Sequence, residues 1–157
     1  MKIALGTAQF GLPYGIAENG QVSASEISAI LECAVEAGID TIDTAVSYGD
    51  SEERLGVAGV SGLNVITKLP SMPEQLFDIA RWVYKQIGDS TIRLKEQHVH
   101  GILLHQPTQL FELRGKELWR VVNSLKKHKI VSKIGYSIYD PSELDVLFDD
   151  FRPDIVQ

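Results

Sequence analysis

Four residue types in this sequence can together move a proton to a carbonyl oxygen: Asp43, Tyr48, Lys68 and His105. A tyrosine hydroxyl, whose reference pKa is about 10, is a poor proton donor at neutral pH unless a cation stabilises the phenolate. Lys68 can supply that cation, and a carboxylate such as Asp43 keeps a lysine charged inside a pocket. His105 can donate a hydrogen bond to a substrate oxygen. The set fits the protonation of a carbonyl oxygen that is becoming an alkoxide.

Asp43 is the residue that most needs a partner. It closes a predicted strand of Thr41-Ile42, and an ionised carboxylate that enters a core is costly unless it meets a cation. We therefore expect Lys68 to pair with it. The electrons for a carbonyl reduction must come from a cofactor, since no protein side chain donates a hydride.

These residues follow predicted strands. Strand and helix patterns alternate along the chain, which indicates a parallel sheet with helical crossovers. Ligand sites in such sheets gather at the carboxyl ends of the strands, where Asp43, Lys68 and His105 fall. The expected strands span residues 3–7, 41–45, 65–69, 99–104 and 131–137, with a sixth that opens at 154.

Helical spacing of apolar residues predicts five helices. A capping-box spacing from Ser23 to Glu26 opens the first helix, in which Cys33 is expected to be a small core residue. Gly88 is expected to weaken or interrupt the third helix. The expected helices span residues 23–38, from 51 onward, 76–87, 118–125 and 140–148.

Length decides between two arrangements of such units, an open doubly wound sheet and a (β/α)8 barrel. Each strand with its helix takes about 25 to 30 residues, so a full barrel needs about 250. This chain of 157 residues has room for about six strands and five helices. If the fold is the α/β parallel barrel of the TIM type, we expect residues 1–157 to form a single partial domain that lacks the last two strand–helix units.

Composition excludes several classes of partner. The formal charge of −6, with no basic cluster longer than residues 126–129, argues against nucleic acid. No apolar run approaches the length of a membrane span, and no secretory signal opens the chain. Cys33 is the single cysteine, so no intrachain disulfide can form, as in a reducing compartment. We expect a cytoplasmic protein.

The order of motifs resembles the aldo-keto reductase family along essentially the whole chain. The likeness is carried by Leu5-Gly6-Thr7, Gly38-Ile39-Asp40-Thr41-Ile42-Asp43-Thr44-Ala45, Tyr48-Gly49, Glu52 to Gly56, Ile66-Thr67-Lys68, Leu103-Leu104-His105, Ile134-Gly135-Tyr136-Ser137 and Val156-Gln157. It implies NADPH-dependent reduction of aldehydes, ketones and sugars, that is, a small-molecule carbonyl substrate. Tyr48 would be the general acid, Lys68 with Asp43 would tune its pKa, and His105 would orient the substrate.

The resemblance also implies a cofactor site. Gly6, Thr7 and Asp43 would lie at the cofactor, and Ser137 and Gln157 would contact the nicotinamide carboxamide. The sequence departs from the family's pattern at three points. Ile138 replaces the usual asparagine, His100 replaces a common aspartate, and the strands whose loops hold the cofactor phosphates are absent.

Other interpretations stay open. Taken singly, Asp43, Tyr48, Lys68 and His105 would each be ordinary turn, cap or strand-end residues. His98 and His100 alternate as metal ligands might, but they lie at the amino end of a strand, so no metal is expected. The chain could be a non-catalytic fragment that self-associates through open strand edges. It could also be a lyase that forms an imine on Lys68.

Overall fold

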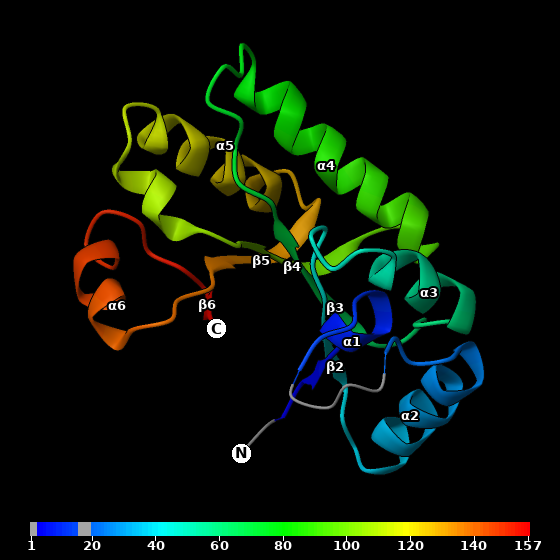
Figure 1. The fold of residues 1–157 in the computed structure, drawn as a ribbon. Coiled ribbons are helices and arrows are strands. Elements are labelled where there is room, and N and C mark those ends of the chain that lie inside the picture. Colours follow the sequence, from blue (N-terminus) through cyan, green and yellow to red (C-terminus); the bar gives the residue numbers. More distant parts are fainter. Residues whose placement is uncertain (1–2, 16–19) are drawn as a thin grey trace.

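The computed structural model describes residues 3–15 and 20–157. Within these residues, six parallel strands form one sheet whose spatial order is the sequence order. A doubly wound sheet would reverse its strand order at a switch point, so that alternative is wrong. The sheet curls into part of a (β/α)8 barrel (Figure 1). The strands are β1 (Leu5–Gly6), β2 (Thr41–Asp43), β3 (Asn64–Leu69), β4 (Val99–Leu104), β5 (Val131–Tyr136) and β6 (Ile155–Val156).

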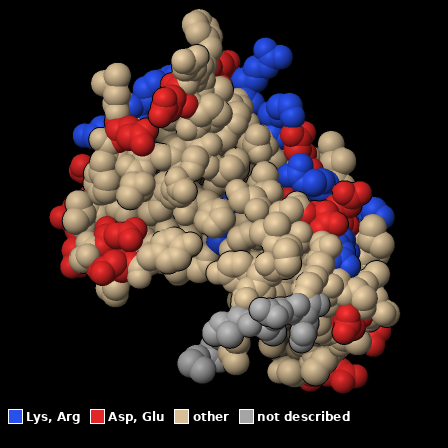
Figure 2. Space-filling view, viewed as in Figure 1, with Lys and Arg blue, Asp and Glu red and all other residues tan. Residues whose placement is uncertain are grey.

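The helices lie around the outside of this curled sheet (Figure 1). Figure 2 shows a hollow on the opposite side, between the α2 end and the α6 end of the molecule, with mostly uncharged walls in this view. The helices are α1 (Ala8–Gly11), α2 (Ala24–Glu36), α3 (Ser51–Ala58), α4 (Ile79–Leu94), α5 (Gly115–Lys127), α6 (Pro141–Leu147) and the 3-10 helix η1 (Pro107–Phe111).

Two layers of apolar side chains make the core. The convex face of the sheet contributes residues such as Leu69 and Ile102, and α4 meets it with the fully buried Val83. The concave face carries the other side chains of the same strands. There, a Cβ added at Gly101 would lie 3.3 Å from Ile155 and 3.4 Å from Ile66, so the three residues share this face.

The predicted helix starts are confirmed where a capping motif marks them. Ser23 and Glu26 form a reciprocal capping box at the start of α2, and Asp140 and Glu143 form another at α6. Both partners of such a motif lie within one turn of the chain, which is why the sequence alone predicts it.

Three expectations about the helices are wrong. Gly88 does not interrupt α4, because buried Ile87 and Ser90 on either side of it hold the helix against the core. The stretch between the first expected strand and the helix expected from residue 23 contains the helical turn α1, for which no helix was predicted. Cys33 is exposed, because the buried positions of α2 are Ile27, Leu31 and Ala34.

Two glycines set how closely neighbouring elements approach. A Cβ at Gly135 would lie 1.7 Å from the Ile155 carbonyl oxygen. Any side chain at this position would therefore push β6 away from β5. A Cβ at Gly56 would lie 2.1 Å from the Arg93 carbonyl oxygen, which fixes the approach of α3 to α4.

Candidate active site

The curled sheet brings four predicted site residues together at the carboxyl ends of neighbouring strands. Asp43 is the last residue of β2, Lys68 is near the end of β3, and His105 directly follows β4. Tyr48 lies in the loop between β2 and α3. These residues come from three consecutive strand units, so only the parallel register of the sheet places them side by side.

Lys68 is the centre of this group. Its Nζ lies 2.8 and 2.9 Å from the two carboxylate oxygens of Asp43, and it donates to the Thr44 carbonyl oxygen at 2.9 Å. It also donates to the Tyr48 hydroxyl at 3.2 Å. The Lys68 side chain is 1% exposed and that of Asp43 is 13% exposed. The pairing expected for Asp43 is therefore present, as a buried ion pair.

Burial and charge act in opposite directions on Lys68. Burial lowers the pKa of the Lys68 ammonium, and the hydrogen bond and the negative charge of Asp43 oppose that shift. Asp43 is thus the group that favours the charged lysine. Without it, the ammonium would be buried with only neutral oxygen acceptors around it.

The Tyr48 hydroxyl is held in its neutral form. Burial raises the pKa of Tyr48 to about 12, and the charges of Asp43, Tyr139 and Tyr14 add to the shift. The expectation that Lys68 stabilises the phenolate of Tyr48 stays a prediction, which the hydrogen bond between the two side chains allows.

His105 faces the Tyr48 ring. The two ring centroids are 5.6 Å apart in an edge-to-face arrangement with an interplanar angle of 84°. Burial lowers the pKa of His105, and the positive charge of Lys68 lowers it further. A neutral imidazole is therefore favoured at pH 7, and it carries one N–H that can donate to a ligand.

Beneath the four residues lies a set of buried hydroxyls. The Thr7 hydroxyl donates to the Asp43 carbonyl oxygen at 2.9 Å, and Ser51 donates to the Thr7 carbonyl oxygen at 2.9 Å. Thr44 and Ser51 share a hydrogen bond of 3.2 Å. Since Thr7 is fully buried, its side chain positions the β2 backbone at Asp43. Its place in a cofactor site stays a prediction.

A cavity of about 350 Å³ opens between β1 and Tyr48. Among its lining residues, Gly6 and Asp43 come from paired strands, while Tyr14 comes from the loop after α1. A side chain at Gly6 would meet no atom within 4 Å. This cavity is where a ligand could approach both Asp43 and Tyr48.

The other two predicted contact residues lie at the far side of the sheet. Ser137 follows β5 and is buried, and Gln157 follows β6 and is exposed. Backbone hydrogen bonds join the two strand ends, from Ile138 N to the Gln157 oxygen at 2.8 Å and from Gln157 N to the Tyr136 oxygen at 3.1 Å. The structure thus brings these residues next to each other, and their role stays a prediction.

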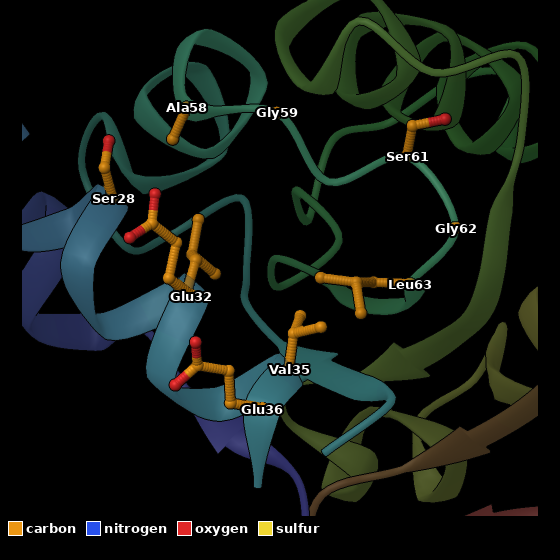
Figure 3. A pocket seen from close by; sticks show the side chains of 10 residues that line it. Ser28, Glu32, Val35, Glu36, Ala58, Gly59, Ser61, Gly62 and Leu63 are labelled. Carbon is orange, nitrogen blue, oxygen red and sulfur yellow. The ribbon is translucent and has the colours of Figure 1, made fainter. Parts of the chain in front are cut away.

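A larger cavity lies away from this group. It has a volume of about 510 Å³ and lies between α2 and the segment from α3 to β3 (Figure 3). Val35 of α2 and Leu63 point toward one another across it, and Glu32, Glu36 and Ser61 also line it. None of the predicted site residues lines it, so size alone does not locate the chemistry here.

The sequence analysis did not predict that Glu52 is a buried carboxylate with a structural role. Glu52 of α3 is 2% exposed and accepts hydrogen bonds from Thr67 at 2.6 Å, Ser90 at 3.2 Å and Arg93 at 2.8 Å. It joins α3 to β3 and α4 on the convex side of the sheet. In the sequence, Glu52 is marked only as the first residue of the run from Glu52 to Gly56 that carries the family resemblance. That run does not indicate which residues hydrogen-bond to Glu52.

Within the described residues, no group of three or more histidine, cysteine or carboxylate side chains could hold a metal ion. In the same part of the chain, no helix is both long and apolar enough to cross a bilayer.

Comparisons with known proteins bear on this site. The model of the Aldo/keto reductase family matches residues 2–157. A solved aldo/keto reductase from Brucella melitensis is 26% identical, with 98% of this chain and 56% of that chain covered and a TM-score of 0.68. Aldo-keto reductase AKR11C1 from Bacillus halodurans, in its holo form, is 18% identical, with 99% and 52% covered and a TM-score of 0.74.

A third solved structure, a mutant of Gox0644 in complex with NADPH, is 24% identical, with 94% of this chain and 49% of that chain covered and a TM-score of 0.63. A comparison with curated proteins gave no match. The chain spans about half the length of the solved structures it matches. The two structures below 25% identity show the fold alone.

Proposed function

Because the chain belongs to the aldo-keto reductase family, which makes it an oxidoreductase by lineage, we propose that the protein reduces an aldehyde, ketone or sugar carbonyl with NADPH. The observation that supports this most is the buried contact of Lys68 with Asp43 and Tyr48. A phenol within 3.2 Å of an ammonium held by a carboxylate can release a proton and be stabilised as the phenolate. NADPH, when bound, supplies the hydride.

Each residue of the group has one task in this proposal. Tyr48 donates its hydroxyl proton to the carbonyl oxygen as negative charge develops there. Lys68 stabilises the phenolate that forms, and Asp43 holds Lys68 in place and charged. The lowered pKa of His105 favours its neutral ring, which lies edge-on to Tyr48, so its N–H can donate to the same carbonyl oxygen and orient it.

The residues present fit the nicotinamide end of the cofactor. The cavity of about 350 Å³ is open at Gly6 and reaches Asp43 and Tyr48. Ser137 and Gln157 could offer a hydroxyl and an amide to a carboxamide group. Residues for the cofactor phosphates are not assigned, since the family places them after strands that follow the sixth. We propose in the same way that the protein is cytoplasmic, binds NADPH and acts on a small-molecule substrate.

The geometry of Lys68 argues against the imine-forming lyase. Imine formation needs a neutral amine that can reach a carbonyl carbon. Lys68 is fully buried, and its Nζ is occupied by Asp43, Thr44 and Tyr48. A carbonyl substrate could reach it only after these contacts break.

Replacement of Tyr48 tests the proposal. In a protein that contains the whole barrel, Tyr48→Phe removes the proton donor and keeps the ring against His105. We expect carbonyl reduction to fall by at least about a hundredfold, as for loss of a general acid, while NADPH binding measured by fluorescence stays near that of the unaltered protein. Equal reduction rates in both proteins would remove Tyr48 from this role.

A further inference from the structure

Ser51, the first residue of α3, joins three parts of the chain that meet at the candidate active site. Its side chain is fully buried, so its hydroxyl needs partners within the protein. The hydroxyl donates to the Thr7 carbonyl oxygen at 2.9 Å and shares a hydrogen bond of 3.2 Å with the Thr44 hydroxyl. The Ser51 amide donates to the Tyr48 carbonyl oxygen at 3.0 Å. Ser51 therefore ties the ends of β1 and β2 to the loop that carries Tyr48.

Thr44 extends this connection to Lys68. Its carbonyl oxygen accepts a hydrogen bond from the Lys68 ammonium at 2.9 Å, and its amide donates to the Ile66 carbonyl oxygen at 2.9 Å. The Thr44 side chain is fully buried, and its hydroxyl is paired with that of Ser51. A buried hydroxyl that loses its partner is costly, so removal of the Ser51 hydroxyl favours a shift of Thr44 away from its present position.

Backbone packing on the other side of the Tyr48 loop leaves little room for the loop to adjust. A Cβ added at Gly11 would lie 1.7 Å from the Tyr48 carbonyl oxygen and 2.5 Å from the Ser51 amide nitrogen. A Cβ added at Gly49 would lie 2.3 Å from the Gly11 carbonyl oxygen. The segment from Thr7 to Gly11 is thus a wall against the loop, and the hydrogen bond from Ser51 to Thr7 holds that wall in place.

The contact that depends on this arrangement is the one between Lys68 and Tyr48. The Lys68 Nζ lies 3.2 Å from the Tyr48 hydroxyl, farther than from its carboxylate and carbonyl acceptors at 2.8 to 2.9 Å. Lys68 comes from β3 and Tyr48 from a loop, so their distance changes whenever the loop moves relative to the Thr44 carbonyl. A misplacement of about 1 Å between reacting groups can cost about a hundredfold in rate.

We propose that Ser51 is a positioning residue for proton transfer, whose hydroxyl acts through Thr44 to hold the Lys68 ammonium at the Tyr48 hydroxyl. The catalytic consequence rests on the proposed reductase function, whereas the state of Lys68 can be measured without turnover. A purely structural serine would affect the stability of the fold and leave Lys68 and the rate of the folded protein unchanged.

The first test follows the Lys68 ammonium in the 157-residue chain by NMR with ¹⁵N-labelled lysine. Buried, hydrogen-bonded protons exchange slowly with water, and Lys68→Met identifies the signal. We expect Ser51→Ala to speed this exchange about fivefold, the size of one lost hydrogen bond. Thr44→Val, which removes the partner hydroxyl at nearly constant shape, should do the same. The double variant should exchange no faster than the single variants, since both remove the same hydrogen bond.

Ser90→Ala is the matched control. Ser90 is also a fully buried serine, but it lies on α4 and its hydroxyl donates to Glu52 at 3.2 Å. Its loss should leave the exchange of the Lys68 ammonium unchanged.

The second test measures carbonyl reduction in a protein that contains the whole barrel, at a temperature where circular dichroism shows each variant to be folded. We expect Ser51→Ala to lower kcat about tenfold with KM changed by less than about twofold, as for an interaction that matters in the transition state. Ser90→Ala should retain kcat.

The outcomes separate this proposal from the reductase function. Unchanged ammonium exchange in Ser51→Ala and Thr44→Val, or effects that add in the double variant, overturn the connection through Thr44. A kcat loss in Ser51→Ala no larger than in Ser90→Ala overturns the positioning role. If Ser51→Ala fails to fold, Thr44→Val decides both points. Carbonyl reduction that survives Tyr48→Phe would instead overturn the reductase mechanism and leave the ammonium result in place.

Discussion

Removal of the Lys68 charge should destabilise the protein far more than removal of an exposed lysine. Two unit charges 2.8 Å apart attract by roughly 6 kcal/mol at an effective dielectric constant of about 20, before desolvation is subtracted. Lys68→Met leaves the Asp43 carboxylate, which is 13% exposed, without its cation. We expect a loss of about 3 to 5 kcal/mol in the free energy of unfolding.

The assay is urea unfolding at pH 7, followed by circular dichroism, for Lys68→Met, Asp43→Asn and the double variant. Because the double variant removes both charges, it should be less destabilised than the sum of the single variants by at least about 1 kcal/mol. The matched control is Lys85→Met, which breaks the exposed ion pair of Lys85 with Asp89 at 2.6 Å.

The control pair has side chains that are 68% and 36% exposed, so its loss should cost no more than about 0.5 kcal/mol. A cost for Lys68→Met no larger than that for Lys85→Met would refute the expected difference between a buried and an exposed pair. Effects of Lys68→Met and Asp43→Asn that add without coupling would refute it as well, since the expected coupling comes from direct contact between the two charges.

Four further predictions concern titration, packing and assembly. Because the Tyr48 pKa is raised to about 12, the stability that comes with its protonated form is complete below about pH 10 and is lost as pH rises through 12. The ultraviolet difference between the unaltered protein and Tyr48→Phe should show this phenol titrating near 12, and a midpoint near 10 would contradict it. Glu52→Ala should lower the free energy of unfolding in urea by about 3 kcal/mol, because it leaves the buried hydroxyls of Thr67 and Ser90 without their acceptor. A cost below about 1 kcal/mol would contradict the assignment of that network. Gly135→Ala should destabilise by at least about 1 to 3 kcal/mol because its Cβ meets a carbonyl oxygen, whereas Gly88→Ala, in open space on α4, should stabilise by up to about 1 kcal/mol; equal effects would argue against the close β5–β6 contact. The strand edges at β1 and β6 should make the chain self-associate in light scattering as concentration rises, and a monomer at all concentrations would count against the interaction-module alternative.

Capping boxes and carboxyl-terminal strand positions were predictable from the sequence alone. The capping boxes at Ser23 and Asp140 depend on contacts three residues apart, so the sequence contains both partners. The placement of Asp43, Lys68 and His105 at one rim follows from strand alternation together with the rule for parallel sheets. The need of Asp43 for a cation also followed from the cost of burying a carboxylate.

Other properties depend on what surrounds a residue in space. The uninterrupted α4 at Gly88 results from core packing on both sides of it, which outweighs the low helix propensity of glycine. The upward pKa shift of Tyr48 comes from burial and from the charges of Asp43, Tyr139 and Tyr14, which no spacing reveals. The exposure of Cys33 depends on which face of α2 meets the sheet.

The sequence by itself determined which groups could exchange a proton and on which strands they lie. Only the tertiary structure decided that Lys68 is buried against Asp43 and Tyr48, and that the buried hydroxyls of Thr44 and Ser51 share a hydrogen bond beside this group. The physical reason is that chemical type and strand order are local properties of the chain. Distance, burial and the resulting charge balance arise only when strands far apart in sequence pair in one register.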